Sequence, residues 1–368
     1  MKKIKLLFIF FLITNCIYGN EDQKVKPLFD HELNIQSFHG KNDELLIMLH
    51  GYQADWKWAK YLHSCGFIED TILGFNFPDH DCINRKLPPE SYCFGTIEEL
   101  LPAFFVLKQC VIDQKKHKIN ICGFSAGGGA LINILSILNS HRFEKELQQI
   151  GINAKEKKEI LSAIQEGIVV LEVPLKSIEE IIEGRGSSPE LKFVGDRYKK
   201  NKLVPIENVK GFKGLKLKVI VYLEENDPVV FNRDDDLLIE RLRKFNSGIT
   251  FVVKGKGNKH ADCHKDLWSF YALQPFKQRI NPHFENNTCK GLIKGLYPLM
   301  DYKIIYYFRL KDGQEIKEME SLKSDEKGLI EFSVTKDNID WDSLPFFKIT
   351  AQDERFNSVS YSTEKTSF

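Results

Sequence analysis

A serine set between two glycines is the feature of this sequence best suited to chemistry. Residues 123–127 read Gly-Phe-Ser-Ala-Gly, and they separate a mostly apolar run at 119–122 from a stretch whose apolar residues recur at helical spacing. The pattern predicts a strand, a sharp turn at Ser125 and a helix. The glycines remove side-chain collisions in such a turn, and the first amides of the helix point toward an anion bound beside the serine. These residues favour nucleophilic attack by the serine and stabilisation of an oxyanion.

This strand, turn and helix resemble the nucleophile elbow of the α/β-hydrolases. The resemblance covers about residues 44–273 and implies a mostly parallel, doubly wound α/β sheet. Residues 44–49 agree with it, because a continuous apolar run is typical of a strand buried on both faces. The motifs point to a fold and a catalytic triad, and they do not identify a substrate.

The resemblance also implies the two partners that a serine nucleophile needs. Asp227 follows a predicted strand at 215–223 and precedes Pro-Val-Val, which is similar to the triad acid of the family. His260 lies in a loop past the last predicted core strand, where the family places its base, and His264 in the same loop is the alternative. In this interpretation His260 takes the proton of Ser125, while Asp227 fixes the tautomer of the imidazole.

A second turn is expected to complete the oxyanion site. Residues 50–53 read His-Gly-Tyr-Gln and follow an early predicted strand. By the resemblance, the backbone amide of Tyr52, or alternatively that of Gln53, binds the oxyanion together with the amide of Ala126. Gly51 permits the close backbone approach that this role requires.

The periodicity of the remaining chain predicts the elements that position these residues. After a polar lead at 20–40 with no predicted element, helices are expected at 56–65, 96–112, 144–165, 234–245 and 266–273, and further strands at 71–77, 167–173 and 249–253. Thr96 with Glu99 three residues later predicts a capping box. The loop at 78–90 carries His80 and Asp81, which are expected to be solvated, with substrate contact as the alternative.

Two later segments define the domain organisation. Residues 177–214 have a weaker pattern and lie where the family places a lid or cap, with a surface excursion as the alternative. Residues 288–368 change to short alternating runs separated by turn signals, which predicts a small all-β sandwich similar to fibronectin type III or immunoglobulin-like modules. Strands that extend the hydrolase core at 20–287 are the alternative. A surface or glycan contact of this module is an expectation that the fold alone does not confer.

Residues 1–19 are predicted to be a secretory signal peptide. Three lysines stand within the first five residues, an apolar run follows at 6–13, and Gly19 offers a small residue at the cleavage point. The apolar run is short for a membrane span. An uncut anchor and a lipoprotein signal ending at Cys16 are the alternatives, and the protein is expected to be secreted or periplasmic.

Cysteine usage fits an oxidising compartment. One of the eight cysteines lies in the predicted signal, so an odd number remains and at least one thiol must be free. Cys122 on the elbow strand is the predicted free thiol, and the disulfides considered are Cys82–Cys93 and Cys263–Cys289. No Cys-x-x-Cys or Cys-x-x-His spacing favours a metal site, and no cofactor is expected.

The sequence therefore predicts an enzyme that hydrolyses a carboxylic ester of a small molecule through an acyl-enzyme intermediate. The formal net charge of +1 gives no basic field that would favour nucleic acid. A thioesterase or serine peptidase of the same fold is an alternative. The non-enzyme alternative is a secreted binding protein on a hydrolase scaffold with a vestigial triad.

Overall fold

The computed structural model describes most of the chain, which divides into two compact units. The described residues are 24–25, 33–66, 68–78, 92–230, 235–255, 260, 267–268, 271–272, 280–285, 288–294, 296, 299, 301–309, 314–326, 329–335, 348–352 and 359–362. The first unit comprises Met1–Thr250 and Lys254–Lys265, and the second comprises Phe251–Val253 and Asp266–Phe368. The predicted signal peptide at 1–19 lies outside the described residues and stays a prediction.

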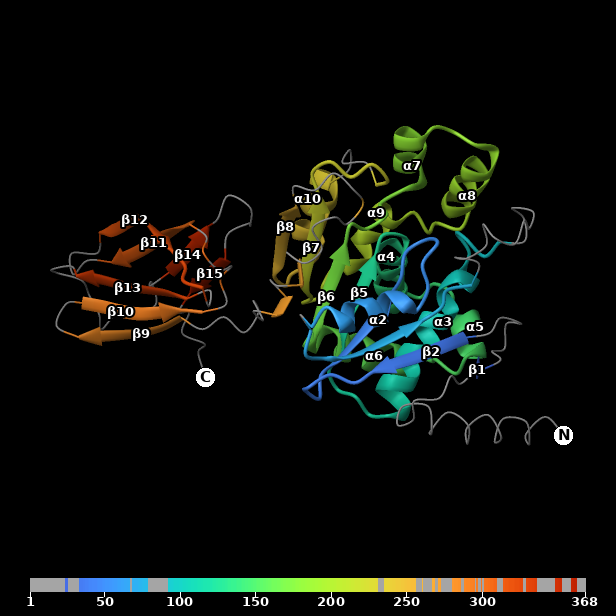
Figure 1. The fold of residues 1–368 in the computed structure, drawn as a ribbon, viewed down its shortest axis with the longest axis horizontal. Coiled ribbons are helices and arrows are strands. Elements are labelled where there is room, and N and C mark those ends of the chain that lie inside the picture. The colour runs from blue at the N-terminus through green and yellow to red at the C-terminus, as the bar shows by residue number, and fades with distance from the viewer. Residues whose placement is uncertain are drawn as a thin grey trace. The chain divides into compact units, whose positions relative to one another are not determined.

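The first unit is built on an eight-stranded, mostly parallel sheet (Figure 1). Its strands are β1 (Lys24–Val25), β2 (Leu33–Phe38), β3 (Leu45–Leu49), β4 (Thr71–Phe75), β5 (Asn120–Phe124), β6 (Ile168–Glu172), β7 (Lys218–Glu224) and β8 (Thr250–Gly255), and only the two ends of β8 count with the first unit. The strand order is β1-β2-β4-β3-β5-β6-β7-β8. Neighbours from β4 to β7 pair in parallel, whereas β2 pairs antiparallel with β1 and β4. This confirms the predicted α/β class.

The central strands form because their sequences are apolar almost throughout. Every residue of β3, β5 and β6 is buried, as expected for strands covered on both faces. Because these strands run in parallel, their carboxyl ends lie along one edge of the sheet. The predicted nucleophile at the end of β5 and the predicted acid after β7 belong to this edge.

Helices connect the strands and cover the sheet. They are α2 (Lys57–Ser64), α3 (Ile97–Lys108), the π-helical turn η3 (Gln109–Asp113), α4 (Ala126–Leu138), α5 (Glu144–Gln149), α6 (Ala154–Glu166), α7 (Ile178–Arg185), α8 (Pro189–Lys200), α9 (Pro205–Asn208), the 3-10 turn η4 (Val209–Phe212) and α10 (Asp235–Phe245). α4 is buried along its whole length, because its sequence is apolar on every side. None of the helices within the described ranges is both long enough and apolar enough to span a bilayer.

The elements differ from the expected ones at two places. The polar lead at 20–40 contains β2, whose residues Ile35–Phe38 pair with β4. The helix predicted at 144–165 is two helices, α5 and α6. Gly151, with a φ of 76°, ends the first, and Asn153 caps the second by accepting from the amides of the first turn.

The predicted capping box of α3 is also wrong. Thr96 does occupy the position before the helix, but its hydroxyl donates to the carbonyl of Cys93 at 2.7 Å. Glu99 instead accepts from the amide of Gly95 at 2.8 Å and from the hydroxyl of Tyr198 at 3.0 Å. A tertiary contact from α8 therefore replaces the local cap.

The second unit contains two antiparallel sheets, which confirms the predicted all-β module. Their strands are β9 (Ile280–Glu285), β10 (Thr288–Ile293), β11 (Asp301–Arg309), β12 (Glu315–Lys323), β13 (Ile330–Thr335), β14 (Lys348–Gln352) and β15 (Val359–Ser362). The sheet orders are β13-β10-β9 and β12-β11-β14-β15. Along β13 buried and exposed residues alternate, and the ring of Phe332 lies 5.9 Å from that of Tyr306 on β11. The strands begin at Ile280, ahead of the predicted boundary at 288.

Candidate active site

Ser125 lies at a tight turn between β5 and α4, in a backbone conformation that residues with side chains rarely adopt. Its φ is 52° and its ψ is −116°. Strain of this kind persists only where the surroundings fix it. A Cβ atom at Gly123 would lie 2.4 Å from the carbonyl oxygen of Gly127, and one at Gly127 would lie 2.2 Å from that of Leu49. Only glycine fits on either side of this turn.

Backbone hydrogen bonds from neighbouring segments hold Ser125 in place. Its N–H donates to the carbonyl of Glu172 at 2.9 Å, which fastens the turn to the end of β6. Its carbonyl accepts from the amides of Leu175 at 2.8 Å and Gly128 at 2.9 Å. The turn is therefore fixed both by the segment after β6 and by the first turn of α4.

The segment after β7 brings Asp227 beside His260. Oδ1 of Asp227 accepts from the amides of Val229 at 2.7 Å and Val230 at 3.0 Å, and Oδ2 lies 2.7 Å from Nδ1 of His260. Burial would raise the pKa of Asp227, but the hydrogen bond and charge of His260, together with the two amides, lower it below its usual value. The carboxylate is therefore ionised, and it favours a proton on Nδ1 of His260.

The other ring nitrogen of His260 lies beside the cavity that contains Ser125. Nε2 is buried and has no hydrogen-bond partner among the described residues. The His260 ring lies 5.2 Å from that of Phe124, the residue before Ser125, and His260 and Ser125 line one cavity. No hydrogen bond joins Ser125 to His260 in the described structure. Such contacts often tighten only once a substrate is bound.

The turn at 50–53 lies against the serine and is held by a buried histidine. A Cβ atom at Gly51 would lie 3.0 Å from Cβ of Ser125. Nδ1–H of His50 donates to the carbonyl of Gly51 at 2.8 Å, and Nε2 accepts from the amide of Phe77 at 3.0 Å. These two bonds require a neutral imidazole with its proton on Nδ1. The sequence does not indicate this tautomer, because Phe77 lies just beyond the end of β4, 27 residues from His50.

A cavity of about 310 Å³ opens over these residues. The residues that line it are Tyr52, Gln53, Tyr92, Phe94, Phe124, Ser125, Ala126, Leu175, Ile178, Ile181, Arg185, Glu190, Leu191, Val194, Tyr198, Val229, Val230 and His260. The wall thus contains both predicted oxyanion residues, Tyr52 and Ala126, and the alternative, Gln53. Most of the wall is apolar. Asp227 stands behind His260 and does not line the cavity.

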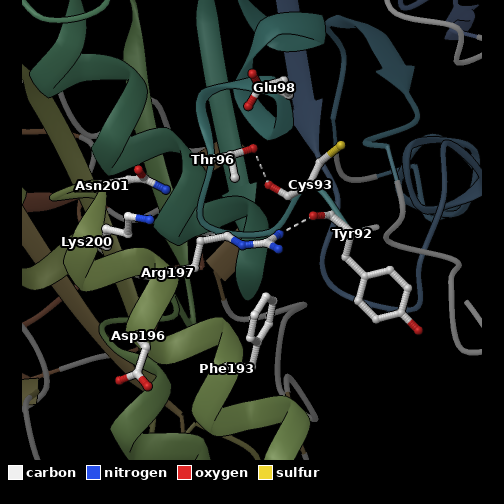
Figure 2. Close-up of a pocket in the computed structure, with 9 residues that line it drawn as sticks. All are labelled: Tyr92, Cys93, Thr96, Glu98, Phe193, Asp196, Arg197, Lys200 and Asn201. Carbon is white, nitrogen blue, oxygen red and sulfur yellow. Dashed lines mark hydrogen bonds between the residues drawn. The ribbon is translucent and has the colours of Figure 1, made fainter. Parts of the chain in front are cut away.

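Helices α7 and α8, from the segment predicted as a lid at 177–214, supply a large part of this wall. One edge of α8 is tied to the segment before α3 (Figure 2). The guanidinium of Arg197 donates to the carbonyl of Tyr92. The side-chain amide of Asn201 donates to the carbonyl of Gly95 at 2.8 Å. Tyr92, Arg197 and Asn201 line a second hollow, of about 510 Å³, whose described lining contains none of Ser125, Asp227 and His260.

A buried charge cluster fastens the start of α7. Lys176 is only 1% exposed, and its Nζ lies 2.5 Å from Oδ1 of Asp235 on α10 and 3.2 Å from Oε1 of Glu180 on α7. Lys176 and Glu180 have the i, i+4 spacing of a helical ion pair, which is a signal the sequence carries. Nothing in the sequence indicates that Asp235 joins them.

Several predicted residues lie outside the described part of the chain. They are His80, Asp81, Cys82, Cys263 and His264. The two disulfides considered therefore stay predictions, as does the choice between the two histidines.

The predicted free thiol is confirmed. Cys122 forms no disulfide, and neither do Cys65 and Cys110. Burial, followed by the charge of Glu172, raises the pKa of the Cys122 thiol, and burial raises that of Cys110 to about 12. Both are inert packing residues at neutral pH. Within the described ranges no group of three or more histidine, cysteine or acidic side chains is arranged to hold a metal ion.

Comparisons with known proteins give distant structural likenesses. No protein-family model matches the chain, and no curated protein is significantly similar to it. The chain is similar to an esterase of Pyrococcus furiosus at 15% identity and a TM-score of 0.45, with 69% of this chain and 89% of that chain covered. It is similar to a lipase/esterase of Lactobacillus plantarum at 11% identity and a TM-score of 0.47, with 69% and 95% covered. It is similar to a monoacylglycerol lipase of Paleococcus ferrophilus at 14% identity and a TM-score of 0.40, with 66% of this chain and 97% of that chain covered. Likenesses at this level carry no argument about activity.

The fold follows from the molecule itself. A mostly parallel sheet carries a strained serine on the turn between β5 and α4. An acid follows β7 and a histidine follows β8, in the chain order serine, acid, histidine. The first unit of this chain therefore has the α/β-hydrolase fold.

Proposed function

We propose that this protein is a serine hydrolase that cleaves a carboxylic ester through an acyl-enzyme intermediate. The observation that carries the proposal is the 2.7 Å contact between Asp227 Oδ2 and His260 Nδ1, behind a cavity that His260 shares with Ser125. A carboxylate on Nδ1 leaves Nε2 without a proton and able to act as a base. The base therefore faces the cavity in which the strained serine lies.

In the proposed mechanism, Ser125 Oγ attacks the carbonyl carbon of the ester while His260 Nε2 takes the hydroxyl proton. Asp227 stabilises the imidazolium that forms. The negative charge on the carbonyl oxygen is bound by the amides of Ala126 and Tyr52, each expected to contribute about 3 kcal/mol to the transition state. His260 then returns the proton to the leaving alkoxide, and the same residues activate a water molecule that hydrolyses the acyl-enzyme.

The proposed substrate class rests on chemistry and on the cavity. An alkoxide leaves more readily than an amine, so an ester makes the smaller demand on this site. The cavity of about 310 Å³ is at the lower end of the range for small-molecule sites and has a mostly apolar wall. It suits a small ester with an apolar body.

A fluorophosphonate probe tests the nucleophile directly. The wild-type protein is expected to be labelled on one serine and to release p-nitrophenol from short acyl esters. Ser125→Ala should lose both properties, because the substitution removes the proposed nucleophilic hydroxyl. Ser64→Ala is the matched control, because Ser64 is an exposed serine at the end of α2. Circular dichroism establishes that each variant is folded.

Two outcomes would count against the proposal. Folded wild-type protein that takes up no probe would favour the binding protein with a vestigial triad. Labelling that survives in Ser125→Ala would assign the nucleophile to another residue. A parallel panel of acyl esters, thioesters and peptide amides then separates an esterase from a thioesterase or a peptidase.

A further inference from the structure

The wall of the cavity contains few charged side chains. Among the described residues that line it, the acidic and basic side chains other than His260 are Arg185, the last residue of α7, and Glu190, in the first turn of α8. The remaining lining side chains are apolar or uncharged. Within the described part of the wall, a charged group on a ligand would therefore meet one of these two residues.

The negative charge of Glu190 is stabilised by groups at the start of its own helix. The backbone amide of Glu190 and the hydroxyl of Ser188 donate to its carboxylate and lower its pKa. The hydroxyl of Ser188 also accepts from the amide of Leu191 at 3.1 Å, as a helix cap. The negative charge of Glu190 is thus directed at the positive end of α8.

The positive charge of Arg185 has no comparable stabilising partner among the described residues. Its guanidinium forms no ion pair with a carboxylate in the described part of the chain. An arginine is charged at every pH relevant to folding and offers a planar set of donors that matches a carboxylate. The alternative is a structural role, in which the positive charge of Arg185 interacts with the negative end of the α7 dipole, since Arg185 lies in the last turn of that helix.

The spacing along α7 places this cation away from the elbow. Ile178, Ile181 and Arg185 all line the cavity, and their i, i+3, i+7 spacing puts them on one face of the helix. α7 begins three residues after Leu175, whose amide donates to Ser125 at 2.8 Å. With a rise of about 1.5 Å per residue, Arg185 lies about 10 Å further along the axis than Ile178.

We propose that the substrate is an ester with an anionic end, an apolar middle that lies along Ile178 and Ile181, and a carboxylate that pairs with Arg185. This inference rests on the proposed function and names its substrate class. The anionic end belongs either to the acyl part, as in a half ester of a dicarboxylic acid, or to the alcohol part, as in an ester of an ω-hydroxy acid. Both forms present the same carboxylate to Arg185.

Steady-state hydrolysis in a pH-stat tests the proposal. One arm compares monoethyl esters of adipic, suberic and sebacic acid with ethyl esters of hexanoic, octanoic and decanoic acid. The other arm compares acetate esters of ω-hydroxy acids with acetate esters of alkanols of the same length. The wild-type protein should prefer the anionic member in one arm, which identifies the side that carries the charge, and the preference should weaken as salt screens it.

The variants separate recognition from helix stability. Arg185→Met should lower kcat/KM for the anionic ester about tenfold and leave that for the neutral ester of equal length unchanged, because only the anionic ester loses a charged partner. Arg185→Lys should retain part of the preference. Lys192→Met is the matched control, since Lys192 is an exposed cation on α8 that does not line the cavity.

The outcomes distinguish this inference from the function on which it rests. Equal losses on anionic and neutral esters in Arg185→Met would show a structural role and overturn the inference. A preference for anionic esters that Arg185→Met leaves intact would overturn it as well. If neutral esters are hydrolysed and the probe labels Ser125, the proposed function stands in either case. If no ester is cleaved and no probe is taken up, the proposed function falls and the inference falls with it.

Discussion

The carboxylate of Asp227 accepts three hydrogen bonds, and its two oxygens have different partners. Oδ1 accepts from the amides of Val229 and Val230, and Oδ2 accepts from Nδ1–H of His260. The amides fix the carboxylate, and the carboxylate in turn fixes the imidazole. A substitution that preserves one oxygen and changes the other can therefore separate structure from chemistry.

Asp227→Asn is that substitution. The amide oxygen can still accept from Val229 and Val230, but the amide nitrogen cannot accept from Nδ1–H of His260, so the imidazole is driven toward the wrong tautomer. We expect kcat for ester hydrolysis to fall by a factor on the order of 10³ to 10⁴ with little change in KM. Steady-state kinetics on a p-nitrophenyl ester measure this, and a loss below tenfold would contradict the assigned role.

The same variant has an expected signature in the pH dependence of stability. A carboxyl group whose pKa is lowered by folding stabilises the native state fully above its unfolded value, about 3.9, and loses that contribution as the pH falls through the native value. The difference in unfolding free energy between wild type and Asp227→Asn should therefore be largest near neutral pH and shrink below about pH 4. Urea unfolding at several pH values measures this difference. A difference that grows on acidification would contradict the prediction.

At this scale the sequence identifies residue types better than it identifies contacts. Ser125 is recognisable because its glycines are local, and Gly123 and Gly127 are fixed by backbone approaches within one turn. The contact between Asp227 and His260 spans 33 residues, and chain order alone could only suggest it. The bond from Phe77 to His50 is set by the packing of two strands and leaves no mark in the local sequence.

At the scale of elements, α7 depends on the charges at its base. Replacing Lys176 by methionine would remove the cation that the fully buried carboxylate of Glu180 shares with the half-buried carboxylate of Asp235, at an expected cost of about 3–5 kcal/mol in unfolding free energy. Because α7 lines the cavity, KM for an ester should rise more than kcat falls. Urea unfolding and steady-state kinetics measure the two effects.

A second ion pair of the same spacing provides the control. Lys155 and Glu159 on α6 are also four residues apart, with Nζ and Oε1 3.6 Å from each other, but their side chains are 85% and 44% exposed. Lys155→Met should change the unfolding free energy by less than about 0.5 kcal/mol and leave KM unaltered. Equal effects of the two substitutions would mean that burial at the base of α7 has no energetic consequence.

Elements with a continuous or periodic apolar pattern can be predicted from the sequence. β3 matches its expected run at 44–49, since a strand buried on both faces leaves an unbroken signal. β2 has no such signal, because its residues, apart from Leu33, are only half-buried. The break between α5 and α6 depends on the positive φ of Gly151. The sequence does not predict this φ, because a lone glycine in a helical pattern is compatible both with a continuous helix and with a helix end.

At the scale of the whole molecule, the chain contains two compact units with separate buried clusters. In the first, Leu135 on α4 is fully buried behind the elbow. In the second, Phe332 on β13 is 4% exposed and contacts Tyr306 on β11, which joins the two sheets of the module. Units with their own cores are expected to unfold in separable transitions, so that a single midpoint does not describe the protein.

Phe332→Ala and Leu135→Ala test this separation as a matched pair. Each removes a buried apolar side chain, and the expected cost is about 3–5 kcal/mol for the phenylalanine and about 2–5 kcal/mol for the leucine. Phe332→Ala should lower the midpoint of one calorimetric transition and leave kcat for ester hydrolysis at 25 °C unchanged, because the elbow, the acid and the histidine all belong to the first unit. Leu135→Ala should lower the midpoint of the other transition and reduce the temperature at which activity is lost. A single shared transition that both substitutions lower would mean that the β module and the hydrolase unit fold together, and the module would then be part of what holds Ser125 in its strained turn.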